Sequence, residues 1–202
     1  MRLYLIRHGQ TELNEKRCYY GCTDVSLNET GIRQAEKLGS YFSDMKWDSV
    51  VSSPLARAID TAKYLCGRNC DKIVTDSRLA EQNFGIFEKM TAAEIMKRYP
   101  KEWDDWNRNF SDYRISGGES FRDVRERIDN YVDNELKRYQ GTVLLTAHKG
   151  TLGHMIASLL QMPLEGYWNF VFDQGCYNVV DIEDGYAIVR GLNVPIITNG
   201  DK

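Results

Sequence analysis

The chain has 202 residues, of which 42% are hydrophobic and 27% are charged, a composition typical of one soluble domain with a sizeable core. Its 26 basic and 29 acidic residues are spread along the chain and give a net charge of -3, which argues against a nucleic-acid partner. No apolar stretch approaches the roughly 20 residues that cross a bilayer, and no signal-peptide pattern precedes the first predicted strand. We therefore expect a cytoplasmic protein with no membrane partner.

The first predicted unit begins with residues 3–9, LYLIRHG, in which four apolar residues run into Arg7, His8 and Gly9. An apolar run of this kind fits a parallel strand that is covered on both faces. A helix pattern follows at residues 28–42, with Asn28 as the predicted N-cap. On a purely structural interpretation, Arg7 and His8 are solvated loop residues after the strand.

Two further units repeat this order of strand, short polar loop and helix. Residues 48–53 form the second strand, and Pro54 is predicted to lie in the first turn of the helix that follows. Residues 142–150 form the third strand and its loop, which lead into a helix at 151–160. The alternation predicts a three-layer α/β/α fold with a mostly parallel mixed sheet and helices on both faces.

Further short strands are expected in two places outside these units. One covers residues 72–76, and the other is a C-terminal hairpin at 179–189 that turns at Asp184-Gly185. Residues 88–139 depart from the pattern, because 90–110 and 119–139 both look helical around the Gly-rich loop 114–120.

We interpret 88–139 as a helical insertion over the sheet edge and the active site, within a single domain of residues 1–202. Ser116 or Ser120 is expected to cap the second helix of the insertion. Its aromatic residues are expected to pack together, with a substrate-facing role for at least one of them as the alternative. These residues are Trp103, Trp106, Phe110 and Tyr113.

Five cysteines cannot all pair within one chain, which favours a reducing compartment. Cys18 with Cys22, and Cys66 with Cys70, have the C-x3-C spacing that structural zinc sites also use. Neither pair has the flanking glycines of a zinc knuckle, so we favour four unrelated thiols and expect no metal.

Ligands of open α/β sheets bind beyond the carboxyl ends of the strands. The three units bring Arg7 and His8, Arg57, and His148 to that edge. Arginine matches a phosphate in a bidentate manner, so the set predicts a phosphate site. Glu81 follows the predicted strand 72–76. Taken alone, it is interpreted as a solvated carboxylate. If it lies at the same edge of the sheet as the arginines and histidines, it is a candidate general acid.

Four motifs follow one another along nearly the whole chain. They are R-H-G-Q-T-E-L-N at 7–14, S-S-P-L-A-R-A at 52–58, L-A-E-x-x-F-G-x-F-E at 79–88 and A-H-K-G at 147–150. In sequence and in order, these motifs resemble those of the histidine phosphatase superfamily, which includes the cofactor-dependent phosphoglycerate mutases. The resemblance implies a phosphoglycerate mutase-like fold.

The resemblance also implies roles for the residues of the predicted site. His8 would be the nucleophile, which becomes a phosphohistidine, and Glu81 would be the proton donor. The phosphoryl oxygens would be held by Arg7, Arg57, His148 and Asn14, and the substrate-binding set is completed by Tyr20 and Gly21. No metal and no cofactor would be required.

Two positions depart from the usual pattern of the superfamily. Lys149 follows His148 where a small residue is common, and Lys89 follows Glu88 where glycine is usual. We expect the Lys149 side chain to reach solvent.

The segment 162–182, with its D-Q-G-C stretch, and R-G-L-N at 190–193 are similar to the α-ribazole phosphatases of cobalamin nucleotide-loop assembly. This similarity implies a metal-independent phosphomonoester hydrolase that acts on α-ribazole 5′-phosphate. The alternatives are a broad-specificity sugar-phosphate phosphatase, a phosphoglycerate mutase and an inactive regulatory or scaffold protein. The expected partner is a small phosphomonoester, and a homodimer is the assembly considered.

Overall fold

Strand β1 (Arg2–Arg7) lies inside a six-stranded sheet in the computed structural model, which describes residues 1–67 and 72–196. The strand order is β4-β3-β6-β1-β7-β8. β1 pairs in parallel with β6 (Thr142–Ala147), β6 with β3 (Ser49–Ser52), and β3 with β4 (Ile73–Thr75). β7 (Cys176–Glu183) and β8 (Tyr186–Pro195) are antiparallel, so the predicted mostly parallel mixed sheet is confirmed.

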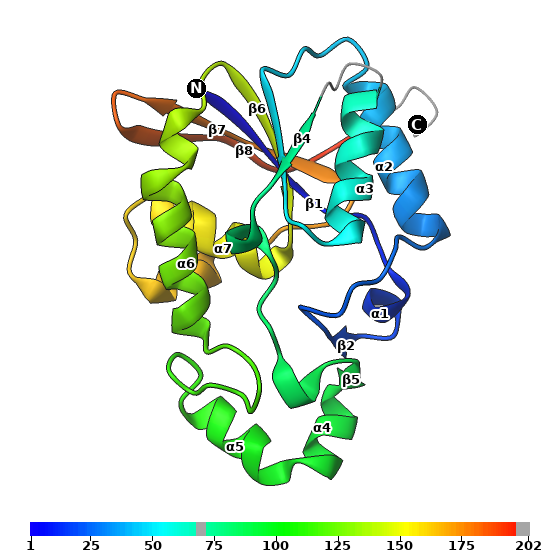
Figure 1. Cartoon of the computed structure of the whole chain (residues 1–202), viewed down its shortest axis with the longest axis vertical. Helices are drawn as coiled ribbons and strands as arrows, with labels where there is room; N and C mark the ends of the chain where they lie inside the picture. The colour runs from blue at the N-terminus through cyan, green and yellow to red at the C-terminus, as the bar shows by residue number, and fades with distance from the viewer. Residues whose placement is uncertain (68–71, 197–202) are drawn as a thin grey trace.

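Alternate residues of β1 pack against opposite faces of the sheet. Leu3 and Leu5 belong to the core cluster that includes residues of α6 (Phe121–Asn134) and α7 (Lys149–Leu159). Tyr4 and Ile6 pack with residues of α2 (Glu29–Tyr41) and α3 (Ala56–Cys66). Figure 1 shows the two helix pairs on opposite sides of the strands, which confirms the predicted three layers. Apolar residues at all of positions 3–6 are therefore needed to fill both interfaces.

Local capping signals explain most of the helix starts. Asn28 caps α2, as predicted, by accepting from the backbone N–H of Gly31 at 2.9 Å. Ser120 caps α6 in a capping box with Asp123, which selects Ser120 over Ser116. Thr11 caps the short helix α1 (Glu12–Glu15), which the sequence analysis did not predict.

The predicted start of α3 was wrong by two residues. The helix begins at Ala56, so Pro54 precedes it instead of lying in its first turn. The backbone N–H of Ala56 donates to Asp24 Oδ1 at 2.8 Å. This bond to a distant segment satisfies one of the unpaired donors at the helix start, and no local pattern could have indicated it.

The predicted hairpin turn between β7 and β8 is confirmed at Asp184-Gly185. Both residues have positive φ angles, 50° and 84°. This combination is the two-residue turn that Asp-Gly favours, because glycine carries no Cβ in the left-handed region.

Residues 88–139 fall into two parts that pack differently. α4 (Ala92–Arg98) and α5 (Pro100–Arg108) surround an aromatic cluster of their own, and they lie at the end of the molecule away from the sheet (Figure 1). A second small sheet, formed by β2 (Cys18–Tyr19) and β5 (Met90–Thr91), joins this part to the loop after β1. α6 instead packs its apolar face on the main sheet, where it and α7 cover the same face.

The aromatic cluster forms the core of the first part. Trp106 is 4% exposed, and Trp103, Phe110 and Tyr113 pack against it or against its buried neighbours. Their main role is packing, as expected.

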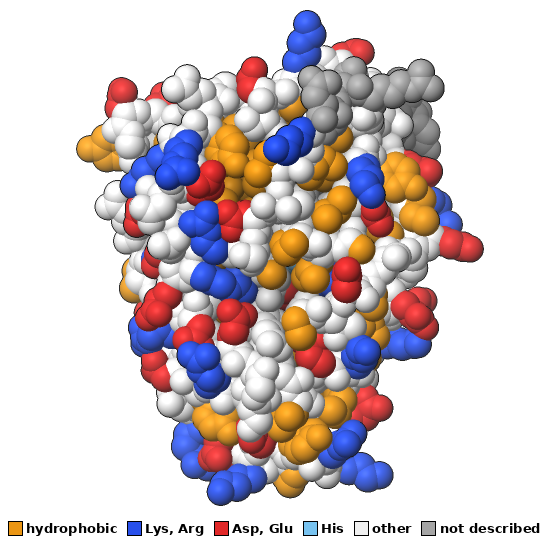
Figure 2. Space-filling model, viewed as in Figure 1, with side chains coloured by type: hydrophobic (Ala, Val, Ile, Leu, Met, Phe, Trp, Pro, Cys, Tyr) orange, Lys and Arg blue, Asp and Glu red, His pale blue; other side chains and the backbone are white. Residues whose placement is uncertain are grey.

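Charged side chains of both signs are interspersed over the face shown in Figure 2, and no histidine is visible there. Within the part of the chain that the structure describes, no helix is long and apolar enough to cross a membrane. Lys149 is exposed, as predicted.

Candidate active site

The parallel strands end at one edge of the sheet, and polar residues follow each strand there. Arg7 is level with Ala147, and Ser52 is level with Thr146. The next residues are therefore neighbours: the backbone N–H of His8 donates to Ala147, and that of Ser53 donates to Thr146. The imidazole rings of His8 and His148 lie 5.0 Å apart between centroids. The sheet register thus brings together histidines that are 140 residues apart in the sequence.

His8 is 3% exposed, and its ring is oriented by the next peptide. Its Nδ1 lies 2.7 Å from the carbonyl oxygen of Gly9. Gly9 itself tolerates no side chain, since a Cβ there would lie 2.5 Å from the carbonyl oxygen of Gly31. Burial, followed by the charges of Arg57 and Arg7, lowers the pKa of His8 well below its ordinary value. The imidazole is therefore neutral at ordinary pH.

Arg57 is fully buried in the first turn of α3 and donates three hydrogen bonds. Its Nε donates to His148 Nδ1 at 3.3 Å, and its Nη2 and Nη1 donate to the carbonyl oxygens of Gly21 and Thr23 at 2.8 and 2.9 Å. The guanidinium also lies over the ring of Tyr20, 4.7 Å from its centroid. A guanidinium carries five N–H donors, so two remain for a ligand.

His148 is fully buried between Arg57 and Ser53. Because arginine only donates, Nδ1 of His148 accepts, and its Nε2 carries the proton that is donated to Ser53 Oγ at 2.7 Å. Burial is the main cause that lowers the pKa of His148, and the charge of Arg57 is the second. The sequence analysis did not include Ser53 in the site. Ser53 directly follows β3, so the search for polar residues beyond the strand ends could have found it.

Arg7 supplies a second cation at this edge. Its Nη1 donates to the carbonyl oxygen of Phe172 at 2.9 Å, while its buried Nε has no partner among the described residues. Burial lowers the pKa of Arg7, and the nearby charge of Glu81 acts in the opposite direction. A buried, unpaired donor beside a second guanidinium is the arrangement that an oxyanion would satisfy.

Glu81 is held against the start of α7. Its carboxylate accepts from the backbone N–H groups of Gln82 and Gly150, at 3.0 and 3.1 Å. A Cβ at residue 150 would lie 2.4 Å from Glu81 Oε1, so Gly150 is required for this approach. Thr151 fixes the segment by donating to the carbonyl oxygen of Ala80 at 2.8 Å.

The remaining predicted binding residues are Asn14, Tyr20 and Gly21. Asn14 Oδ1 accepts from the backbone N–H and the hydroxyl of Thr11. It also accepts from Gln174 Nε2 at 2.9 Å. The amide Nδ2 of Asn14 is left to donate to a ligand. Tyr20 is 7% exposed, and its hydroxyl lies 2.7 Å from Thr11 Oγ1. Tyr20 and Gly21 both contact Arg57, by the ring face and by the backbone carbonyl oxygen.

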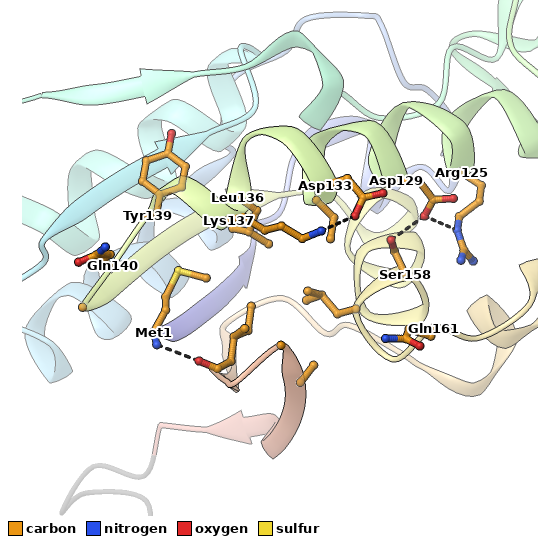
Figure 3. Close-up of a pocket in the computed structure, with 16 residues that line it drawn as sticks. Met1, Arg125, Asp129, Asp133, Leu136, Lys137, Tyr139, Gln140, Ser158 and Gln161 are labelled. Carbon is orange, nitrogen blue, oxygen red and sulfur yellow. Dashed lines mark hydrogen bonds and ion pairs between the residues drawn. The ribbon is translucent and has the colours of Figure 1, made fainter.

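A cavity of about 870 Å³ lies elsewhere, between α6, α7 and the β7–β8 hairpin (Figure 3). Its three cations are already engaged: Arg125 by Asp129, Lys137 by Asp133, and the Met1 ammonium by the carbonyl oxygen of Ile182. The residues that follow the strand ends therefore remain the better candidate for a phosphate site, because they keep an unpaired buried donor, Arg7 Nε.

Metal ligands do not gather in the described residues: no group of three or more His, Cys, Asp or Glu side chains could hold an ion. Cys18, Cys22 and Cys176 are free thiols. Cys70, the partner of Cys66 in the C-x3-C spacing, lies outside the described residues.

Comparison with known proteins gives matches along nearly the whole chain. Residues 3–195 match the histidine phosphatase superfamily (branch 1). The adenosylcobalamin/alpha-ribazole phosphatase of Escherichia coli (strain K12) is 32% identical over 195 residues, 96% of each chain. Phosphoserine phosphatase 1 of Hydrogenobacter thermophilus is 29% identical over 96% of this chain and 92% of its own. The crystal structure of an alpha-ribazole phosphatase from Shigella flexneri has a TM-score of 0.91 and 32% identity, and the match covers 98% of this chain and 100% of the other.

Proposed function

Since the chain belongs to the histidine phosphatase superfamily and is a phosphatase, we propose that the strand-end site hydrolyses phosphomonoesters through a phosphohistidine on His8. The observation that carries this proposal is the neutral, buried imidazole of His8 beside two guanidinium groups with unpaired donors. A phosphoryl group in transfer spreads negative charge over its equatorial oxygens, so fixed cations around a neutral nucleophile favour the reaction.

In the first step, the Nε2 lone pair of His8 attacks phosphorus and the bond from phosphorus to the ester oxygen breaks. Glu81 transfers its proton to that oxygen, which leaves as an alcohol. The phosphorylated imidazole keeps its Nδ1 proton, and the carbonyl oxygen of Gly9 at 2.7 Å stabilises the positive charge.

In the second step, water attacks phosphorus from the opposite side and the bond to Nε2 breaks. Glu81 accepts the proton of the water, so orthophosphate leaves and both His8 and Glu81 regain their starting states. Throughout both steps, the phosphoryl oxygens are held by Arg7, Arg57, His148 and Asn14. His148 Nε2 donates to a phosphoryl oxygen in place of Ser53 Oγ, its partner without a ligand.

We further propose α-ribazole 5′-phosphate as the substrate. Two named relatives support this choice, the phosphatases of Escherichia coli and Shigella flexneri, together with the D-Q-G-C segment of the tail. Gln174 of that segment donates to Asn14 Oδ1 at 2.9 Å, so the segment lies next to a residue that we propose to bind the phosphoryl group. A phosphoserine phosphatase is the second candidate, because a relative of that name is 29% identical over a similar length.

The substrate carries a flat apolar base, which needs an aromatic surface near the leaving group. Trp168, in the 3-10 helix Leu164–Asn169, is 61% exposed and stacks on Phe121 at 5.7 Å and 11°. Its neighbour Tyr167 lies near Glu81 and Arg7. Burial raises the pKa of the Tyr167 hydroxyl, the charge of Glu81 raises it further, and the charge of Arg7 lowers it. We therefore assign the Trp168 ring as the surface on which the base stacks.

The test compares kcat/KM for α-ribazole 5′-phosphate, O-phosphoserine, ribose 5-phosphate and 3-phosphoglycerate. We expect the ribazole compound to exceed the others by at least about tenfold, or roughly 1.4 kcal/mol. Trp168→Ala should narrow that gap, while Trp168→Phe, which keeps a flat ring, should preserve most of it. Equal or better turnover of O-phosphoserine would assign the second candidate, and isomerisation of 3-phosphoglycerate would identify a mutase.

A further inference from the structure

Glu88 accepts five hydrogen bonds although it touches none of the predicted catalytic side chains. Its Oε1 accepts from the backbone N–H groups of Gly21, Cys22 and Phe84, at 2.8, 3.2 and 3.0 Å. Its Oε2 accepts from both the backbone N–H, at 3.1 Å, and the hydroxyl of Thr23. A carboxylate with this many donors fixes the conformation of the loop that supplies them.

The same loop holds Arg57 from its other side. The backbone N–H groups of Gly21 and Thr23 donate to Glu88, while the carbonyl oxygens of these two residues accept from Nη2 and Nη1 of Arg57. In the peptide that joins Gly21 to Cys22, the carbonyl oxygen accepts from Arg57 and the N–H donates to Glu88. Residues 21–23 thus lie between a carboxylate and a guanidinium. Hydrogen bonds in such a chain polarise one another, so each end strengthens the contact at the other.

The orientation of Arg57 depends on these two carbonyl oxygens. Together with the bond from Nε to His148, they use three of the five N–H donors and fix the plane of the guanidinium. A shift of the loop would rotate the plane and redirect the two remaining donors away from the ligand. Small displacements of this kind reduce catalysis strongly, because transition-state charge is stabilised only by groups already in position.

The backbone next to Glu88 supports its placement. Lys89 has a φ of 65°, and its backbone N–H donates to the carbonyl oxygen of Tyr19 at 2.7 Å. This left-handed turn ties the chain beside Glu88 to the residues that precede the loop.

We propose that Glu88 is a positioning residue of the site, which acts on the phosphoryl group through loop 21–23 and Arg57. The inference rests on the proposed function of the site. It assigns to Glu88 a role in phosphoryl binding in addition to any contribution to folding.

The decisive experiment is a double-mutant cycle of Glu88→Gln with Arg57→Ala. The glutamine keeps the size of the side chain but turns one acceptor into a donor that faces N–H groups. We expect Glu88→Gln to lower kcat/KM at least about tenfold in the native background and less than about twofold in the Arg57→Ala background. An equal loss in both backgrounds would overturn the proposal.

A second readout separates this role from that of the proton donor. Loss of phosphoryl positioning should slow an alkyl phosphate and p-nitrophenyl phosphate equally, since both carry the same phosphoryl group. Glu88→Gln should also weaken competitive inhibition by inorganic phosphate. A loss confined to the alkyl phosphate, with unchanged inhibition, would contradict the proposal.

Glu94→Gln is the matched control. Its carboxylate also accepts from a backbone N–H and a hydroxyl, both of Thr91, but it caps α4 and has no link to Arg57. Its kcat/KM should stay within about twofold of the native value. If Glu88→Gln does not fold by circular dichroism, Thr23→Val, which removes one donor to Glu88, replaces it in the same cycle with the same criterion.

The proposed function and the inference can fail separately. A native protein that releases no phosphate from any of the esters would refute the function. Calorimetric binding of inorganic phosphate to the native protein, to Glu88→Gln and to the double variant would still test the coupling between Glu88 and Arg57.

Discussion

The Nδ1 atom of His8 lies 2.7 Å from the carbonyl oxygen of Gly9. Because a carbonyl oxygen only accepts, Nδ1 of the neutral ring carries the proton, and the lone pair is on Nε2. The backbone at Gly9 is itself fixed, since the Gly9 N–H donates to Thr61 Oγ1 at 3.1 Å and that hydroxyl donates to the carbonyl oxygen of Arg57 at 2.7 Å. In the proposed mechanism, one backbone contact thus leaves Nε2 as the nitrogen that attacks phosphorus.

His8→Ala should lower kcat/KM by about 10³-fold or more, because it removes the nucleophile and no other imidazole can take its position. Native protein quenched during turnover of a labelled substrate should carry label that survives alkali and is lost in acid. His154→Gln is the control, since His154 lies in α7 beside Phe121, and it should retain the label. Label on His8→Ala would exclude the mechanism.

Glu81→Gln should slow an alkyl phosphate by at least about 10²-fold and p-nitrophenyl phosphate far less. An alkoxide needs a proton to leave, whereas p-nitrophenolate leaves without one. Steady-state kcat on the two esters provides the measurement, with the second ester as internal control. Equal losses on both would remove Glu81 from the role of proton donor.

All three histidines of the chain are buried with lowered pKa values, and this predicts a loss of stability in acid. Burial lowers the pKa of His154 to about 3, while the unfolded chain binds protons near 6.5. The unfolded state thus takes up more protons below about pH 6.5, so the free energy of unfolding is highest above that pH and falls as the pH decreases.

Between pH 7.5 and 5.5, each histidine should lower the free energy of unfolding by about 1.4 kcal/mol. His154→Gln should therefore lose about 1.4 kcal/mol less than the native protein over that interval, as measured by urea unfolding at both pH values. Identical losses in the two proteins would show that His154 is protonated in the folded state.

Lys89→Gly should stabilise the protein by about 1 kcal/mol. Lys89 has a left-handed backbone, which costs an L-residue about 1–2 kcal/mol, and glycine avoids that cost at a smaller loss of chain entropy. Lys89→Ala keeps the strain and should give no gain in the urea midpoint. A destabilised glycine variant would show that the lysine side chain compensates for its backbone.

Treatment with EDTA should leave kcat unchanged, and the purified protein should contain no stoichiometric zinc. In the proposed site, Arg7 and Arg57 supply the positive charge that a metal would otherwise bring to the phosphoryl group. Elemental analysis that finds one zinc per chain, with activity lost on its removal, would assign the cysteine pairs to a metal site.

Local signals in the sequence were sufficient for the sheet, most helix starts and the strand-end residues. An apolar run predicts a doubly covered strand at β1, and Asn28 and Asp184-Gly185 mark a cap and a turn through bonds within a few residues. His8 and His148 follow the ends of their strands, so the parallel order of the sheet was enough to predict that they meet.

Only the tertiary structure determined the contacts that orient the site. The Arg57 guanidinium depends on carbonyl oxygens of loop 21–23, and that loop depends on Glu88, more than 60 residues further along the chain. Likewise α6 looked like part of an insertion, because its amphipathic pattern is the same whether its apolar face meets α5 or the sheet. Periodicity and capping report contacts between residues near in sequence, whereas packing partners and hydrogen bonds across the fold arise only when distant segments meet.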